Sequence, residues 1–280
     1  MAEWHERRVI VAGGTAGFGF VLARHLVRAG AHVLAVGRSS DGVRRALEAC
    51  ERADGPTATL HGLAADLGRP GEGNRVAGEA LRILGGIDDL FCCVGRSGRA
   101  QILDTTDDEL RDYLAANLFA ATELVRATAD DIAAAKGHVV FIGSLAGKLV
   151  TPFMGPYAVA KSAVAAYADA VRLELEPRGG HVLLVSPGPI RRADDDPAAE
   201  RAIDRYAADA RRAGLPTSAT APGGSANLRQ LDPDRLAAAV LDACRRRDAE
   251  LVVPRKAALL AGLIEWLPNA GRRLLARFVR

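Results

Sequence analysis

Short apolar runs alternate along this chain with longer segments in which apolar residues recur every three or four positions. Such runs suit buried β-strands, whereas the longer spacing places apolar side chains on one face of an α-helix. Strands that alternate with helices favour a parallel sheet covered on both faces. The pattern therefore predicts a single α/β domain, a doubly wound sheet of seven parallel strands flanked by helices. The predicted strands are 8–12, 32–36, 58–63, 88–93, 138–142, 181–185 and 251–253, and the predicted helices are 17–29, 41–53, 74–84, 107–127, 156–176 and 233–246.

The sequence marks the start of two of these helices. Thr106 is followed three residues later by Glu109, which is the pattern of a capping box. Asp232 precedes Pro233, which combines an N-cap residue with a proline at the first helical position. We therefore expect helices to begin at 107 and at 233.

Composition and charge narrow the class of protein. The 280 residues include 37 Lys and Arg against 34 Asp and Glu, a net charge of +3, which gives no argument for nucleic acid as a partner. Cys50, Cys92, Cys93 and Cys244 do not form a metal-ligand pattern, so we expect no metal site. Reduced cysteines and an N-terminus unlike a secretory signal indicate a cytoplasmic protein.

A glycine-rich turn joins the first predicted strand to the first predicted helix. Gly13, Gly17 and Gly19 allow the backbone to bend tightly and to approach a phosphate closely. The helix that follows offers free N–H groups and the positive end of its dipole to a pyrophosphate. A glycine turn between strand and helix predicts a dinucleotide site, and its residues are Gly13, Thr15, Ala16, Gly17, Phe18 and Gly19.

The end of the second predicted strand bears on which dinucleotide binds. Arg38 and Ser39 stand where an acidic residue would bind a ribose diol and repel a phosphate. A guanidinium does the reverse and stacks on adenine, so Arg38 favours NADP(H), with Ser39 as a second donor. The alternative is that Arg38 is simply a solvated residue at a strand end.

Tyr157 and Lys161 carry the strongest indication of chemistry. Four residues separate them, so phenol and ammonium share one face of a helix. The cation stabilises a phenolate and moves the phenol pKa, ordinarily about 10, toward the working range. Ser144 ends an apolar strand, where parallel-sheet enzymes place reactive groups, and its hydroxyl is suited to bind a substrate carbonyl.

These motifs together resemble the short-chain dehydrogenase/reductase family over roughly residues 7–254. The resemblance implies a Rossmann fold, catalysis by Ser144, Tyr157 and Lys161, and a dimer or tetramer. It also implies that Asn117 supports a water in a proton relay and that Asp66 touches the adenine region of the cofactor. The further cofactor-binding positions that it implies are Leu67, Cys93, Gly95, Tyr157, Lys161, Pro187, Gly188 and Ile190.

The chain departs from the family at two places. The family usually has Asn-Asn-Ala-Gly after its fourth strand, whereas this chain has Cys92-Cys93-Val94-Gly95 and so lacks the amides that brace the loop. After Pro187-Gly188 the family often carries a threonine that bonds the nicotinamide carboxamide, whereas this chain reads Pro189-Ile190-Arg191-Arg192. Backbone groups near Ile190 are expected to take over that contact.

Two segments bear on the substrate. Residues 191–231 are predicted to form a substrate lid, in which a helix opens at 194–197 and runs to about 213; the alternative is a disordered surface loop. Residues 255–280 form a predicted basic amphipathic tail, with Trp266 near the end of its apolar run and Glu265 as its single acid. This is the pattern of a membrane-interface helix, too short to span a bilayer. The same apolar stripe would also suit packing on the body or on a second subunit.

The sequence therefore predicts an NADP(H)-dependent oxidoreductase that reduces a ketone or aldehyde, or oxidises a secondary alcohol, on a lipophilic substrate. Residues 1–254 form the predicted catalytic domain. The alternatives are a catalytically weak NADP(H)-binding sensor of the same fold and a protein that acts at lipid surfaces through its tail.

Overall fold

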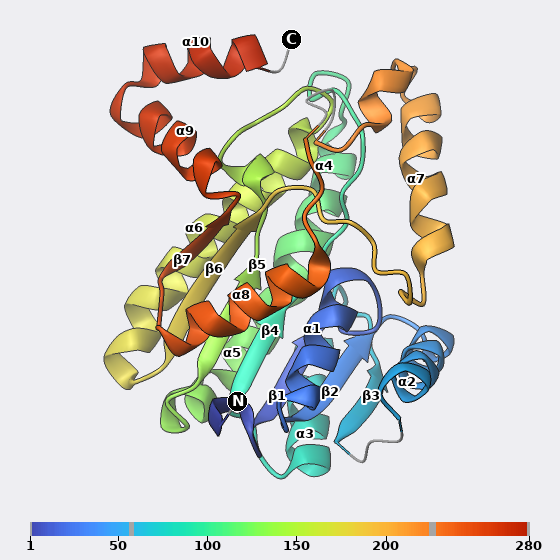
Figure 1. Ribbon diagram of the computed structural model, residues 1–280, viewed down its shortest axis with the longest axis vertical. Coiled ribbons are helices and arrows are strands. Elements are labelled where there is room, and N and C mark those ends of the chain that lie inside the picture. The colour runs from blue at the N-terminus through green and yellow to red at the C-terminus, as the bar shows by residue number, and fades with distance from the viewer. Residues whose placement is uncertain (1, 56–58, 224–227, 279–280) are drawn as a thin grey trace.

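The computed structural model describes residues 2–55, 59–223 and 228–278. At its centre lies a seven-stranded parallel sheet in the order β3-β2-β1-β4-β5-β6-β7 (Figure 1). This confirms the predicted sheet, although residue 58 of the predicted third strand lies outside the described part of the chain. The strands are β1 (Arg8–Ala12), β2 (His32–Gly37), β3 (Leu60–Ala64), β4 (Asp89–Cys92), β5 (His138–Ile142), β6 (His181–Pro187) and β7 (Glu250–Val253).

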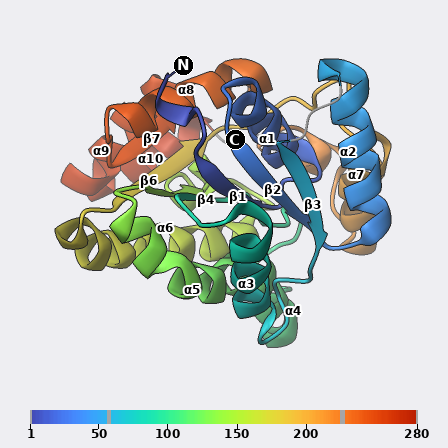
Figure 2. The same cartoon turned by 90° about the horizontal axis from the view of Figure 1, so that it is seen from below.

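Helices cover both faces of the sheet, as the view from below shows (Figure 2). One face packs against α3, α5 and α6, and the other against α1 and α8. Because both faces are covered, the strands are almost wholly apolar. The long helices are α1 (Gly17–Arg28), α2 (Ser40–Asp54), α3 (Glu72–Leu84), α4 (Asp107–Leu114), α5 (Ala120–Ala134), α6 (Gly155–Leu175), α7 (Ala199–Arg212), α8 (Pro233–Arg245), α9 (Arg255–Trp266) and α10 (Pro268–Phe278), and the short ones are η1 (Ala2–Trp4), η2 (Ala115–Phe119), η3 (Leu145–Gly147), η4 (Glu176–Arg178) and η5 (Thr217–Thr220).

Both predicted helix starts are confirmed. Thr106 Oγ1 accepts a hydrogen bond from the backbone N–H of Glu109, and the Glu109 carboxylate accepts one from the N–H of Thr106. Asp232 accepts from the N–H of Arg235 at the start of α8. Each cap satisfies N–H groups that the first helical turn leaves without a partner.

The predicted helix over 107–127 is wrong as a single element. The segment consists of α4, the π-helical turn η2 and α5, which continues to Ala134. The Asn117 side-chain amide donates to the carbonyl of Tyr113 over 2.9 Å. In a regular α-helix this carbonyl would instead accept a hydrogen bond from a backbone N–H. The wider turn brings Asn117 into the interior of the protein, where it is 2% exposed.

Two other predicted helices differ in the structure. The helix predicted to open at 194–197 begins at Ala199, because the carboxylates of Asp195 and Asp196 bind to α1 instead of capping α7. The tail is two helices, since Pro268 lacks an N–H and starts α10 as a new helix. Figure 1 shows α9 and α10 projecting from one end of the body and α7 standing along its other side.

Candidate functional site

A cavity of about 1470 Å³ opens at the carboxyl ends of the strands. In open α/β sheets ligands bind at this edge, where the strand order reverses, which here is between β1 and β4. The cavity brings together the catalytic and cofactor-binding residues that were predicted from the sequence. Its lining includes Gly13, Thr15, Ala16, Gly17, Phe18, Gly19, Arg38, Ser39, Asp66, Leu67, Cys93, Gly95, Asn117, Ser144, Tyr157, Lys161, Pro187, Gly188 and Ile190.

The β1–α1 turn needs its glycines for steric reasons. Gly13 has φ +81° and Gly17 has φ +57°, values that side chains strongly disfavour. A Cβ on Gly19 would lie 2.2 Å from the carbonyl oxygen of Gly13, so the turn could not close. The glycines of the turn consequently add no side chains of their own, which suits the close approach of a dinucleotide phosphate.

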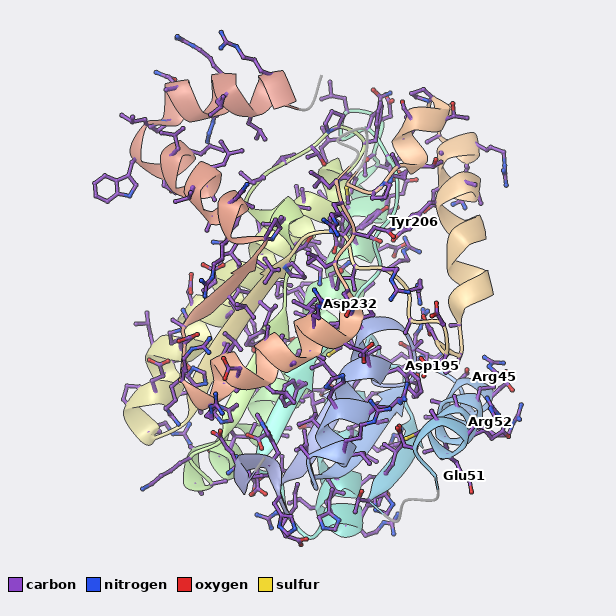
Figure 3. All side chains as sticks on the ribbon, viewed as in Figure 1. Arg45, Glu51, Arg52, Asp195, Tyr206 and Asp232 are labelled. Carbon is purple, nitrogen blue, oxygen red and sulfur yellow. The ribbon has the colours of Figure 1, made fainter. Side chains whose placement is uncertain are left out.

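Polar side chains gather where β2 and β3 end. Arg38 is exposed at the cavity edge, and Ser39 caps α2 by accepting from the N–H of Gly42 over 3.1 Å. Arg45 also lines this end, pairs with Asp41, and carries a buried Nε that has no partner within the described residues. No sequence pattern distinguishes Arg45, because an arginine on an amphipathic surface helix is ordinary. Figure 3 shows Arg45 on α2.

The opposite end of the cavity holds Ser144, Tyr157 and Lys161. Ser144 lies two residues beyond the end of β5 and caps η3, where its Oγ accepts from the N–H of Ala146 over 3.1 Å. Lys161 is 5% exposed, and its Nζ donates to the carbonyl of Ile142 over 2.8 Å. Burial lowers the pKa of Lys161 to about 8. Its Nζ lies 5.9 Å from the centre of the Tyr157 ring, which places a cation beside the phenol.

The side chain of Asn117 holds the loop after β4, in which this chain lacks the asparagine amides that are usual in the family. Its Oδ1 accepts from the N–H of Arg96 over 3.2 Å, and its Nδ2 donates to the Arg96 carbonyl over 3.0 Å. Cys93 adds a backbone hydrogen bond of 2.8 Å to the carbonyl of Ala12. The loop after β4 is therefore fixed by Asn117 and by the backbone.

Cys92 and Cys93 point to opposite faces of the sheet. Cys92 packs with the layer of α3, α5 and α6, and Cys93 packs against the layer of α1 and α8. Both thiols are free, and burial raises the pKa of Cys93 to about 12 and that of Cys92 further. Both are consequently neutral packing groups at physiological pH.

The 191–231 segment and the tail form the remaining wall of the cavity. Tyr206 of α7 hydrogen-bonds through its hydroxyl to Ser97 over 2.6 Å, and its ring lies 4.3 Å from the guanidinium of Arg99 (Figure 3). Arg99 is 5% exposed and donates to the carbonyl of Ala219 over 2.6 Å. No sequence pattern identified Arg99. The tail contributes apolar lining through Leu259, Leu260, Leu263, Leu274 and Leu275.

Two kinds of feature are absent from the described residues. No group of three or more His, Cys, Asp or Glu side chains among them could hold a metal ion. Among the helices that the structure describes, none combines the length and apolar character required to cross a bilayer.

Comparison with known proteins identifies the family. The family described as short chain dehydrogenase matches residues 7–201, and the chain belongs to this family of oxidoreductases, whose members use a nicotinamide cofactor. The chain is 29% identical over 277 residues to dehydrogenase/reductase SDR family member 7B of Bos taurus, covering 97% of this chain and 81% of that protein. It is 32% identical over 222 residues to the Rattus norvegicus protein of the same name, covering 78% of this chain and 66% of that protein.

The fold agrees with solved structures. A short-chain dehydrogenase/reductase of unknown function from Caenorhabditis elegans, crystallised with cofactor, superimposes with a TM-score of 0.71 at 21% identity. The alignment covers 89% of this chain and 94% of the nematode chain. At that identity the likeness concerns the fold.

Proposed function

We propose that this protein is an NADP(H)-dependent reductase of a lipophilic ketone or aldehyde. The observation that carries the proposal is the meeting of Ser144, Tyr157 and Lys161 with the glycine turn around one cavity. Arg38 and Arg45 at the β2 end support NADP(H), because guanidinium groups suit a ribose phosphate. Since cells generally keep NADP reduced, reduction is the proposed direction.

Each polar group at the catalytic end has a proposed task. When bound, the nicotinamide supplies a hydride to the carbonyl carbon. Tyr157 donates a proton to the carbonyl oxygen, which Ser144 also hydrogen-bonds. Lys161 stabilises the Tyr157 phenolate and holds the nicotinamide ribose. Asn117, fixed between Tyr113 and Arg96, orders a relay water.

The apolar end of the cavity supports a lipophilic substrate. The tail lines it with leucines, and Leu149 and Met154 add further apolar surface. Burying a methylene group contributes about 0.8 kcal/mol, so a chain lying along this wall would strengthen binding. We also infer a cytoplasmic homo-oligomer, a dimer or tetramer; the exposed Phe119, Val159 and Leu173 on η2 and α6 support a subunit contact there.

Replacing Tyr157 with phenylalanine tests the chemistry. Tyr157→Phe removes the proton donor, so we expect NADPH-dependent reduction to fall by about 10²–10⁴-fold while the Kd for NADPH stays unchanged. Tyr167→Phe is the matched control, because Tyr167 lies on the same helix and packs edge-on against Phe141 in the core. Turnover in Tyr157→Phe equal to that of the unaltered protein would contradict the proposal.

Replacing Arg38 tests the choice of cofactor. Arg38→Ala should weaken NADPH binding, followed by nicotinamide fluorescence, and leave NADH binding nearly unchanged, because only NADPH carries the ribose phosphate. Arg52→Ala removes the same charge from the far end of α2 and serves as the control (Figure 3). Equal loss of NADPH and NADH would assign Arg38 to the adenine or the ribose instead.

The alternative function is that of a catalytically weak NADP(H)-binding sensor. The absence of the loop amides at Cys92 and Cys93 and of the threonine after Pro187-Gly188 supports it. The two functions differ in one outcome. A sensor would bind NADPH tightly and show no carbonyl reduction over a panel of short- and long-chain ketones.

A further inference from the structure

The start of the 191–231 segment returns to the glycine turn of α1. The Asp196 side chain is 0% exposed, and its Oδ1 accepts from the N–H of Gly17 over 3.0 Å and from the N–H of Ala198 over 3.1 Å. The other oxygen of Asp196 pairs with the guanidinium of Arg192. Nη1 of Arg192 lies 3.4 Å from the point that a Cβ on Gly17 would occupy. A carboxylate and a guanidinium of this segment are thus placed on the turn.

A second ion pair fixes the same segment. Arg24 of α1 is 7% exposed, pairs with Asp195, and also donates to Asp54 of α2 over 2.7 Å. Figure 3 shows Asp195 where the start of α7 meets the body. Two neighbouring aspartates therefore tie the segment to one helix, and they hold the backbone that carries Arg192.

We infer that Arg192 binds the phosphates of the nicotinamide cofactor and that Asp196 positions it there. The inference rests on the proposed function. The N-terminus of α1 attracts anions, but it already faces the buried carboxylate of Asp196, which repels a second anion. A pyrophosphate at this turn therefore needs a cation, and Arg192 lines the cavity at that place.

The guanidinium of Arg192 has capacity for a ligand. Its side chain is 37% exposed, and within the described residues its guanidinium pairs with Asp196 alone. A guanidinium carries five N–H donors in a planar fork that matches phosphate oxygens. Asp196 accepts from Nη1 of this guanidinium, so the remaining N–H donors on its exposed side are left for a ligand in the cavity. The stretch where the family often has a threonine thus supplies a charged phosphate ligand in this chain.

Arg191 provides the matched control. It carries the same charge one residue earlier, and it pairs with Asp194 over 3.3 Å and with Asp232 over 3.5 Å. Asp194 is exposed, and Asp232 is half-buried at the start of α8. Arg191→Ala therefore makes the same change in net charge without touching the glycine turn.

The test measures the binding of NADPH, NADH and 2′-AMP by titration calorimetry. Arg192→Ala should weaken NADPH and NADH alike, by about tenfold, because both carry the pyrophosphate, and should leave 2′-AMP unchanged. Arg191→Ala should bind all three as the unaltered protein does. Unchanged binding of both dinucleotides by Arg192→Ala would overturn the inference, and so would a loss confined to NADPH and 2′-AMP, which would assign Arg192 to the ribose phosphate.

Two further variants separate binding from folding and from positioning. Arg192→Ala leaves the carboxylate of Asp196 buried without its cation, so Arg192→Ala/Asp196→Asn, which keeps the buried site neutral and removes the repulsion, should show a smaller loss than Arg192→Ala, because the phosphate ligand is still missing, with a Tm close to that of the unaltered protein. Asp196→Asn alone should also weaken both dinucleotides by a smaller factor, because the loss of the ion pair that holds Arg192 outweighs the relief of the repulsion. Recovery of full binding in the double variant would overturn the role of Arg192. An unaltered protein that bound neither dinucleotide would instead overturn the proposed function, and this inference with it.

Discussion

A buried ammonium group such as Lys161 is costly to keep charged. Its side chain donates to the Ile142 carbonyl, and the nearest thiols, Cys92 and Cys93, stay neutral and supply no counter-charge. Burial is the main cause that lowers the pKa of Lys161 to about 8. Near neutral pH the residue is mostly charged, but a rise of one or two pH units removes the charge.

This pKa predicts the pH dependence of the reaction. The cation is present below pH 8 and is lost above it, so kcat/KM for NADPH in carbonyl reduction should fall as the pH rises through about 8. A profile of kcat/KM from pH 6 to 10 measures this. Lys161→Met should give a lower rate without that fall. A profile in the unaltered protein that stayed level to pH 10 would contradict the role assigned to Lys161.

The two tail helices have an inner and an outer surface. On the inner surface Leu260, Leu263, Leu274 and Leu275 line the cavity. On the outer surface Trp266 and Leu267 are 87% and 58% exposed. One face of the tail therefore lines the cavity, while another offers apolar side chains among basic ones. We propose that the outer face contacts anionic lipid surfaces.

Vesicle sedimentation tests the outer face of the tail. The unaltered protein should sediment with vesicles containing phosphatidylglycerol, and less with pure phosphatidylcholine, because the tail is basic. Trp266→Ser/Leu267→Ser should lose most of that binding. Leu81→Ser/Leu103→Ser removes two side chains that are 43% and 95% exposed outside the tail and should bind normally. An unaltered protein that stays in the supernatant with both lipids would rule out the lipid contact.

At the scale of the whole molecule, the sheet separates two polar regions. The cavity lies at the carboxyl ends of the strands, and His138 and His181 face each other where β5 and β6 begin. Their Nδ1 atoms are 2.8 Å apart, and Nε2 of His181 lies 2.9 Å from the carbonyl of Asp248. Because that carbonyl only accepts, His181 carries its proton on Nε2 and its Nδ1 accepts from His138. The His181 ring is therefore neutral, and the lowered pKa of His138 keeps that ring neutral as well.

The histidine pair predicts how stability depends on pH. Burial, followed by the nearby His181, Arg7 and Arg247, lowers the pKa of His138 from 6.5 to about 3. Between these values the unfolded chain binds a proton that the folded chain excludes, so stability falls as the pH drops from 6.5 toward 3.

The contribution of His138 to that slope is at most about 1.4 kcal/mol per pH unit. The free energy of unfolding, measured from pH 7 to 4.5, should therefore decline less steeply in His138→Phe. His61→Gln replaces a half-buried imidazole outside the pair and should keep the steep decline. Identical slopes in the unaltered protein and in His138→Phe would show that another group accounts for the acid sensitivity.

The sequence by itself determined the strand and helix pattern, the helix caps and the glycine turn. These features depend on neighbours within one or two turns of chain, so apolar spacing and residue type predict them. The alternation of strands and helices and the resemblance to a family then predicted the parallel sheet and the candidate site residues. Only the tertiary structure decided the π-helical turn at Asn117, the places of Arg45 and Arg99 at the cavity and the contacts of Asp195 and Asp196 with α1. The pairs Gly17 with Asp196 and His138 with His181 lie 179 and 43 residues apart. No local pattern records such pairs, because burial and charge bring these groups together only when the sheet has formed.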